Sequence, residues 1–204
     1  MKKQPDLLNE NYWSSRYQNT DVAWDMGKVS PPLKTYFDQL TDKSISILIP
    51  GCGNAYEANY LLQKGFKNIT LIDISPLPVD KLKKQFAAFL NKEINIICGD
   101  FFTLNQTFDL IVEQTFFCAI DPSLRTDYAN KMHELLNVNG KLAGVLFNRT
   151  FDAGPPFSGS KAEYDKLFQN KFKIKTMEDC NNSIEPRNGS ELFVILKKLN
   201  DQFN

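Results

Sequence analysis

The sequence predicts an α/β fold in which a mostly parallel, seven-stranded sheet is covered by helices on both faces. From Ser44 onward, apolar runs of strand length alternate with longer segments of helical periodicity. The 204 residues, 42% of them hydrophobic, also suffice for one sizeable core but not for two. We therefore expect one domain over 1–204, made of an N-terminal segment, 1–43, and an α/β body, 44–204.

The elements of the body follow from these patterns in order. Strands are predicted near 45–50, 69–74, 94–98, 108–113, 140–147, 171–177 and 191–198. Helices are predicted near 55–64, 77–91, 122–137 and 160–169. Ligands of open α/β sheets bind at the carboxyl ends of the strands, so motifs at these ends are the functional candidates.

The N-terminal segment differs from the body. It lacks strand alternation and holds both tryptophans within a dozen residues. A helix is predicted to start at Pro31-Pro32, because prolines are tolerated in a first turn and four apolar residues then recur at helical spacing. These are Leu33, Tyr36, Phe37 and Leu40. We expect the segment to pack on the body.

The charge balance and composition indicate which classes of binding partner to expect. Lysine plus arginine and aspartate plus glutamate both number 24, so no overall field favours nucleic acid or a membrane surface. The N-terminus shows no apolar signal region, and no stretch is long enough to span a bilayer. We expect a cytoplasmic monomer with a small-molecule partner.

The cysteines and the single histidine argue against disulfides, a metal site and a histidine-based catalytic triad. Cys52, Cys98, Cys118 and Cys180 form no C-x-x-C pair, which predicts reduced and mostly buried thiols. His133, the only histidine, lies in a helical pattern and is predicted to be a helix-face residue. No metal site or Ser-His-Asp triad is expected.

A glycine turn follows the first strand. Gly51 and Gly53 in "PGCGNAYE" let the backbone turn tightly and approach a ligand, which the next helix N-terminus would favour if it were anionic. A dinucleotide fingerprint would continue with glycine where Tyr56 stands. A smaller anion, such as an amino-acid carboxylate, therefore suits this turn better than a pyrophosphate. A purely structural tight turn is the alternative.

Two aspartates end the next strands. Asp73 can accept hydrogen bonds from both ribose hydroxyls, which NAD and S-adenosylmethionine share, or it can cap the following helix. In "GDFF", Asp100 can accept from an adenine amine while Phe101 covers the base. The alternative for this second motif is a plain turn with two core phenylalanines.

Polar residues also interrupt the end of the fourth strand. Burying a charged or polar side chain in a core strand is unfavourable, so we expect Glu113 and Gln114 both to face the crevice at the strand ends. Phe116 and Phe117 follow, either as core residues or as the lining of an apolar pocket.

These motifs together resemble class I S-adenosylmethionine-dependent methyltransferases, which have a Rossmann-like fold. The chain is most similar to the thiopurine S-methyltransferase family and its halide/thiol methyltransferase relatives. The resemblance extends from Tyr12 to about Leu199 and is carried by "YWSSRYQNTDVAWD", "PGCGNAYE", "LIDIS", "GDFF", "FFCAIDPSLRTDYANKM" and "PRNGSELF". It implies S-adenosylmethionine as cofactor and S-adenosylhomocysteine as product.

The resemblance also implies a role for particular residues. An aromatic pattern that covers the cofactor falls on Trp13, Tyr17 and Trp24, where many members have tryptophan in the middle position. Ring faces suit a sulfonium, since this cation donates no hydrogen bonds. The alternative is that the tryptophans anchor the segment to the body. Gly51 and Gln114 match positions at the methionine end of the cofactor, Asp73 the ribose acceptor, and Asp100 with Phe101 the adenine site.

The expected reaction is an in-line methyl transfer to a soft nucleophile: a thiol, a thiopurine or a halide. Such an acceptor needs no dedicated base, and Glu113 and Asp152 are unconvincing candidates for one. The acceptor pocket is expected to include the 147–160 loop. Candidate contacts are Phe116, Phe117, Arg149, Phe157 and Arg187, although the two arginines are equally suited to surface salt bridges.

Two alternatives remain at this point. A nicotinamide-dependent oxidoreductase could use the same strand-turn-helix unit, although Tyr56 and the "GDFF" stretch argue against it. A non-catalytic cofactor-binding module could keep the same cofactor positions.

Overall fold

The computed structural model describes residues 8–200, whose core is one seven-stranded sheet with the strand order β3-β2-β1-β4-β5-β7-β6. The strand β7 pairs antiparallel with both its neighbours, whereas the other pairs are parallel. The strands are β1 (Ile47–Pro50), β2 (Ile69–Asp73), β3 (Ile94–Cys98), β4 (Phe108–Gln114), β5 (Leu136–Phe147), β6 (Phe172–Asp179) and β7 (Glu191–Lys198). The predicted fold class is confirmed.

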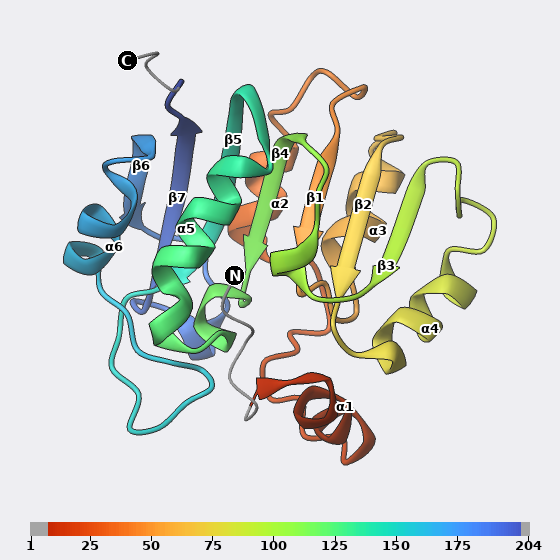
Figure 1. Ribbon diagram of the computed structural model, residues 1–204, viewed down its shortest axis with the longest axis horizontal. Coiled ribbons are helices and arrows are strands. Elements are labelled where there is room, and N and C mark those ends of the chain that lie inside the picture. Colours follow the sequence, from red (N-terminus) through yellow and green to blue (C-terminus); the bar gives the residue numbers. More distant parts are fainter. Residues whose placement is uncertain (1–7, 201–204) are drawn as a thin grey trace.

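Helices cover both faces of the sheet (Figure 1). Apolar residues of α2 (Pro31–Phe37), α3 (Tyr56–Gln63) and α4 (Pro76–Gln85) share one core with the strands. On the other face, α5 (Arg125–Glu134) and α6 (Lys161–Phe168) pack against a second core. The strand order reverses between β1 and β4, which is where an open α/β sheet forms a ligand crevice.

The boundaries of three predicted elements were wrong. The helix predicted over 77–91 ends at Gln85, because the chain turns before Asn91, whose φ is 57°. The fifth strand begins at Leu136 rather than at 140, since this buried residue already pairs with Phe108 of β4. A short 3₁₀ turn occupies the start of the helix predicted over 122–137, so α5 begins at Arg125.

One helix, α1 (Glu10–Gln18), was not predicted at all. No residue of α1 is buried, so its sequence has no apolar stripe to reveal it. Asn9 caps it by accepting a hydrogen bond from the Tyr12 amide at 3.1 Å. In Figure 1 it lies at the end of the sheet toward which β2 and β4 point.

The N-terminal segment is hydrogen-bonded to the body, as expected. The Ser30 amide donates to the buried carboxylate of Glu57 at 2.9 Å, and the Ser14 and Ser75 hydroxyls lie 2.9 Å apart. Asp25 accepts from Asn54 and, at 3.2 Å, from the Tyr56 hydroxyl. Tyr56, which replaces a dinucleotide glycine, therefore ties this segment to the glycine turn.

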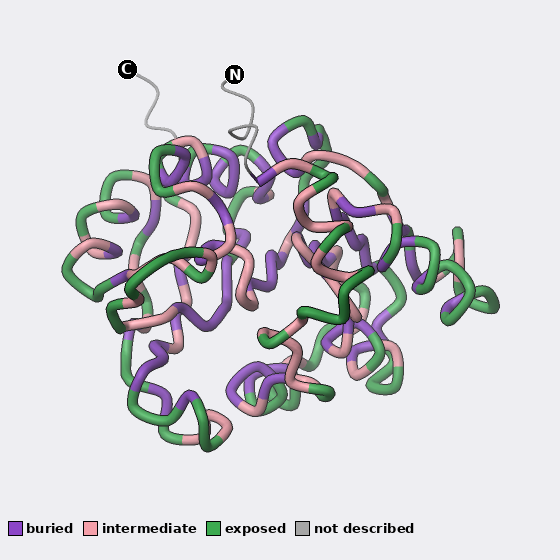
Figure 2. Tube along the Cα trace, turned by 90° about the horizontal axis from the view of Figure 1, so that it is seen from below, coloured by how far each residue is buried: buried purple, intermediate pink, exposed green. Residues whose placement is uncertain are grey.

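Buried residues run through the middle of the molecule and exposed ones lie toward its periphery (Figure 2). Within residues 8–200, the helices are all too short or too polar to cross a bilayer. Residues 1–7 and 201–204 of the predicted domain lie outside the described part.

Candidate functional site

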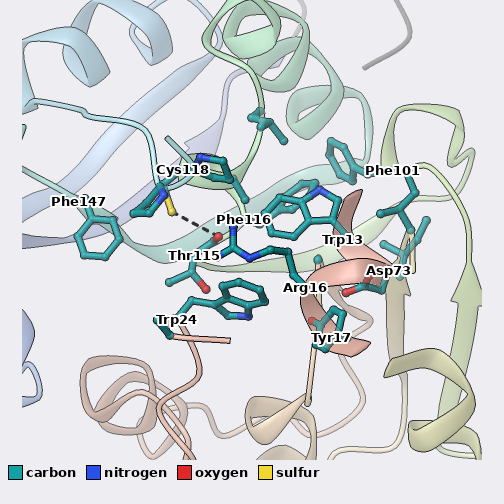
Figure 3. A pocket seen from close by; sticks show the side chains of 18 of the residues that line it. Trp13, Arg16, Tyr17, Trp24, Asp73, Phe101, Thr115, Phe116, Cys118 and Phe147 are labelled. Atoms are coloured by element: carbon teal, nitrogen blue, oxygen red, sulfur yellow. Dashed lines mark hydrogen bonds between the residues drawn. The ribbon is translucent and has the colours of Figure 1, made fainter. Parts of the chain in front are cut away.

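A cavity of about 330 Å³ lies at the carboxyl ends of the central strands, and side chains of α1 form part of its wall (Figure 3). Its walls come from the N-terminal segment, the ends of β1 to β4, the turn after β4, and the loop after β5. The structure brings ten of the predicted site residues to this cavity: Trp13, Tyr17, Trp24, Gly51, Asp73, Asp100, Phe101, Phe116, Arg149 and Arg187.

The glycine turn forms the floor at the end of β1. Gly51 and Gly53 have φ values of 56° and 50°, a region that other residues adopt only with strain. A Cβ on Gly51 would overlap the Phe116 ring, so glycine is also required there for space. The first turn of α3 has no side-chain cap, which leaves its amides available to an anion.

Asp73 is held beside this turn by two backbone amides. Its Oδ2 accepts from Gly53 N at 3.0 Å and its Oδ1 from Ser75 N at 2.9 Å. Burial raises the pKa of the Asp73 carboxyl, while the two amides oppose that shift. Each oxygen keeps one lone pair, so the carboxylate can still accept from two ribose hydroxyls. Its local role before α4 and the predicted ribose role are therefore compatible.

The end of β3 presents an acidic and an aromatic side chain. Asp100 accepts from Phe102 N at 2.9 Å and thereby caps the 3₁₀ turn Phe101–Thr103. Phe101 is 4% exposed, and its ring centroid lies 5.1 Å from that of Phe116 in an edge contact. An adenine could lie here with an acceptor at its amine and an aromatic ring against its face.

Three aromatic residues cover the cavity from the N-terminal segment. The rings of Trp13 and Tyr17 meet that of Trp24 edge-on, with centroids 5.6 Å and 5.8 Å away. Burial raises the pKa of the Tyr17 hydroxyl far above its ordinary value, so this group stays neutral. The cluster offers the neutral ring surface that a sulfonium requires.

Gln114 lies at a smaller hollow next to the main cavity, which it shares with Gly51, Gly53 and Asn54. Both polar atoms of its side chain are buried without a hydrogen-bond partner. Such a pair is costly unless a ligand satisfies it. A carboxylate or ammonium group at the methionine end of S-adenosylmethionine would do so, and the residues present therefore fit this cofactor.

The two predicted arginines also line the cavity. The Arg149 guanidinium is 4.7 Å from the Phe151 ring centroid. Arg187 is buried, donates from Nη2 to the Trp24 carbonyl at 2.7 Å, and lies 3.4 Å from Glu191 through Nη1. The alternative of a surface salt bridge was wrong for Arg187, because both Arg187 and Glu191 are buried.

Besides Gln114, three predicted residues do not line the main cavity. Phe117 is 1% exposed and packs on Tyr128 and Tyr164, which is the core alternative. Phe157 lies outside the cavity wall, and its amide donates to the Cys118 carbonyl at 2.7 Å. Glu113 was wrongly expected to face the crevice: it is fully buried, because its side of the pleat faces α5.

Sequence reasoning also missed residues that line the cavity, among them Arg16, Thr115 and Cys118. Arg16 follows Trp13 by three residues on α1 and lies 5.1 Å from the Trp24 ring centroid. This helical spacing could have identified it if α1 had been predicted. Thr115 has a φ of 56°, and nothing in a β-branched residue indicates such a conformation.

The chain matches known proteins over nearly its whole described length. The family model described as thiopurine S-methyltransferase matches residues 8–200. Probable thiol methyltransferase 2 of Arabidopsis thaliana is 31% identical over 200 residues, which cover 94% of this chain and 88% of that relative. Thiopurine S-methyltransferase of Acinetobacter baylyi is 25% identical, with 84% of this chain and 89% of that protein covered.

Solved structures share the fold at lower identity. The 1,6-didemethyltoxoflavin-N1-methyltransferase of Burkholderia thailandensis, with bound 1,6-didemethyltoxoflavin and S-adenosylhomocysteine, superposes with a TM-score of 0.74. It is 16% identical, and the match covers 94% of this chain and 87% of that one. The magnesium protoporphyrin IX methyltransferase of Synechocystis PCC 6803 gives a TM-score of 0.70 at 14% identity, covering 93% and 97%.

Proposed function

Because this chain belongs to the thiopurine S-methyltransferase family and is an S-adenosylmethionine-dependent methyltransferase of small molecules, we propose that its acceptor is a soft anionic nucleophile. A thiolate, a thiopurine or a halide meets that description. Family membership removes both alternatives that the sequence left open, the nicotinamide-dependent oxidoreductase and the non-catalytic module.

The cofactor position in this proposal follows the geometry of the cavity. The methionine end lies at Gly51 and Gln114, the ribose at Asp73, and the adenine between Asp100 and Phe101. The support is the orphaned amide of Gln114, the free lone pairs of the two aspartates, and the aromatic surface at Phe101. Trp13, Tyr17 and Trp24 then cover the sulfonium.

One observation carries the acceptor class: the described residues that line the cavity include guanidinium groups but no histidine or lysine. Arg16, Arg149 and Arg187 line the cavity. Arg16 is ion-paired with Asp21 at 2.7 Å and Arg187 with Glu191 at 3.4 Å, which leaves Arg149 for an anionic ligand. The carboxylates of the cavity, Asp73 and Asp100, lie at the ends of β2 and β3. His133 is on α5, where its Nε2 lies 2.9 Å from the Leu199 carbonyl. Cations without a base suit an acceptor that arrives already ionised.

For methyl transfer to such an acceptor, the protein only has to position the acceptor. When bound, S-adenosylmethionine supplies an electrophilic methyl group and departs as a neutral thioether, so no acid is required. Arg149, which forms no ion pair among the described residues, would hold the anion behind the methyl group, and the aromatic residues would exclude water. The names of relatives, among them a thiol methyltransferase and the thiocyanate methyltransferases, agree with this acceptor class.

Turnover against a panel of acceptors tests the proposal. Benzenethiol, thiocyanate, iodide and a thiopurine are compared with a catechol and a primary amine, and the soft anions are expected to react preferentially. Arg149→Met should lower kcat/KM for anions by roughly tenfold to a hundredfold without changing S-adenosylhomocysteine affinity. Arg149→Lys keeps the charge and serves as the matched control. Preference for the oxygen or nitrogen acceptors would contradict the proposal.

We also infer that the protein is a cytoplasmic monomer. In the described residues all four cysteines are free thiols, which suits a reducing compartment. Among the described residues, the large apolar side chains that are exposed lie far apart in the sequence: Leu77, Phe89, Val138 and Leu199. Size-exclusion chromatography with light scattering would detect a dimer and so contradict the monomer.

A further inference from the structure

The chain turns sharply where β4 ends, and the side chain of Glu113 holds that turn. Its Oε1 accepts from the amides of Phe116 at 2.8 Å and Phe117 at 2.9 Å. Between them and β4, Thr115 adopts a φ of 56°, and its carbonyl accepts from the Cys118 thiol at 3.4 Å. A strained conformation of this kind persists only where its surroundings enforce it.

A second element fixes the other oxygen of the same carboxylate. The hydroxyl of Tyr128, on α5, donates to Glu113 Oε2 at 2.6 Å. Tyr128 and Glu113 are both fully buried. The carboxylate thus accepts three hydrogen bonds, which link the end of β4, the turn and α5.

The turn carries side chains that form the cavity wall. Phe116, Cys118 and Ala119 all line it, and Figure 3 shows Phe116 among Trp13, Thr115 and Cys118. The Phe116 ring leaves no room for a Cβ on Gly51, and it meets Phe101 at a centroid distance of 5.1 Å. Any shift of the turn therefore changes the space beside the glycine turn and the adenine side.

The charge of Glu113 has no ionic partner among the described residues. The titratable groups near it are Tyr128 on α5, Tyr164 on α6 and Cys118 on the turn, and burial raises the pKa of each, so all three stay neutral near pH 7. The nearby Arg125 guanidinium lies over the Phe117 ring, 4.9 Å from its centroid, and pairs with Glu163 instead.

Protonation would weaken this arrangement. As a carboxylate, Glu113 accepts charge-assisted hydrogen bonds, which are about twice as strong as neutral ones. In the neutral acid, Oε2 would carry the proton and donate to the Tyr128 hydroxyl, so Oε1 would hold the two amides only as a weaker, uncharged acceptor. Burial raises the pKa of Glu113 to about 7, so its ionisation falls within an accessible pH range.

We propose that Glu113 is a positioning residue for methyl transfer, whose ionised carboxylate holds the 115–118 turn so that Phe116 and Cys118 form the cavity wall. It touches neither the cofactor nor the acceptor. The predicted effect on cofactor binding rests on the cofactor position in the proposed function. It does not depend on the class of acceptor.

The pH dependence of S-adenosylhomocysteine binding tests the proposal. Calorimetry between pH 5.5 and 8.5 should show wild-type affinity rising by roughly tenfold, with a midpoint near 7, as expected for a hydrogen bond to a charged group. Glu113→Gln should bind weakly across this range and lack that rise. A wild-type profile without the rise, or an unchanged rise in Glu113→Gln, would overturn the proposal.

Tyr128→Phe separates positioning from a purely structural role. The Tyr128 hydroxyl stabilises the charged form of Glu113, so its removal should move the midpoint to higher pH while the rise persists. A midpoint that stays in place overturns the proposal even if Glu113→Gln fails to fold. Turnover with thiocyanate, whose charge is constant here, should show the same midpoint. Failure of every acceptor with an intact binding profile would refute only the acceptor class.

Discussion

Because Glu113 is buried, its ionisation should make the folded protein less stable as the pH rises. Replacing Glu113 with glutamine should remove this pH dependence. Its pKa is about 7 when buried and near the ordinary 4.5 when the chain is unfolded. Between these values the folded protein binds more protons than the unfolded chain, so stability is lost as the pH rises through this window. One pKa unit corresponds to about 1.4 kcal/mol, so ionising Glu113 in place costs about 3 kcal/mol in total.

Part of this cost lies between pH 5.5 and pH 8. At pH 5.5 the unfolded glutamate is already mostly ionised, so roughly 2 kcal/mol remains to be lost by pH 8. The Glu113→Gln protein lacks this titration. Burial also raises the pKa of Asp73 and Glu57, but both residues are present in both proteins, so their contributions cancel in the comparison.

Urea denaturation at the two pH values measures the effect. The free energy of unfolding of the wild type should fall by roughly 2 kcal/mol more than that of Glu113→Gln. Equal changes in the two proteins would refute the reasoning, because the buried carboxyl would then carry no cost of ionisation. A larger fall in the variant would refute it as well, since the sign would be reversed.

Three further substitutions test the cofactor site through S-adenosylhomocysteine affinity. Gly51→Ala adds about 1 kcal/mol of strain from the left-handed backbone conformation and a clash with Phe116, whereas Gly65→Ala adds similar strain in open space. Calorimetry should show at least tenfold weaker binding for Gly51→Ala only. Equal affinities of the two variants would contradict a close approach of the cofactor to Gly51. Trp24→Ala should weaken binding by about 1–3 kcal/mol, while a lower melting temperature with unchanged affinity would favour an anchoring role. Asp73→Asn turns one acceptor into a donor facing an amide, so both affinity and unfolding free energy should fall by about 1–3 kcal/mol; unchanged affinity would count against the ribose assignment.

The order of strands and helices was determined by local sequence patterns. Apolar runs of four to eight residues between helical segments located all seven strands, because a strand buried on both faces of the sheet leaves a short and nearly continuous apolar run. Gly51 and Asp73 could be found for a related reason, since a turn with positive φ and a strand end each demand particular residue types. By contrast α1 buries no residue, so it left no pattern to detect.

The division of roles at the end of β4 was decided only by the tertiary structure. Glu113 and Gln114 are adjacent polar residues, and the sequence predicted the same environment for both. Successive side chains of a strand point to opposite faces, so Glu113 enters the core beneath α5 while Gln114 lies at the hollow beside the glycine turn. Which of the two faces the core depends on the register of β4 against β1 and β5, and local sequence carries no record of that pairing.

Long-range contacts also had to come from the structure. Arg187 hydrogen-bonds the Trp24 carbonyl across 163 positions, and this contact joins the aromatic cover to the arginine side of the cavity. The sequence by itself determined the fold, the family resemblance and ten of the residues that line the cavity. The tertiary structure decided which neighbours meet there, because contacts between distant segments arise from the packing of whole elements rather than from any local pattern.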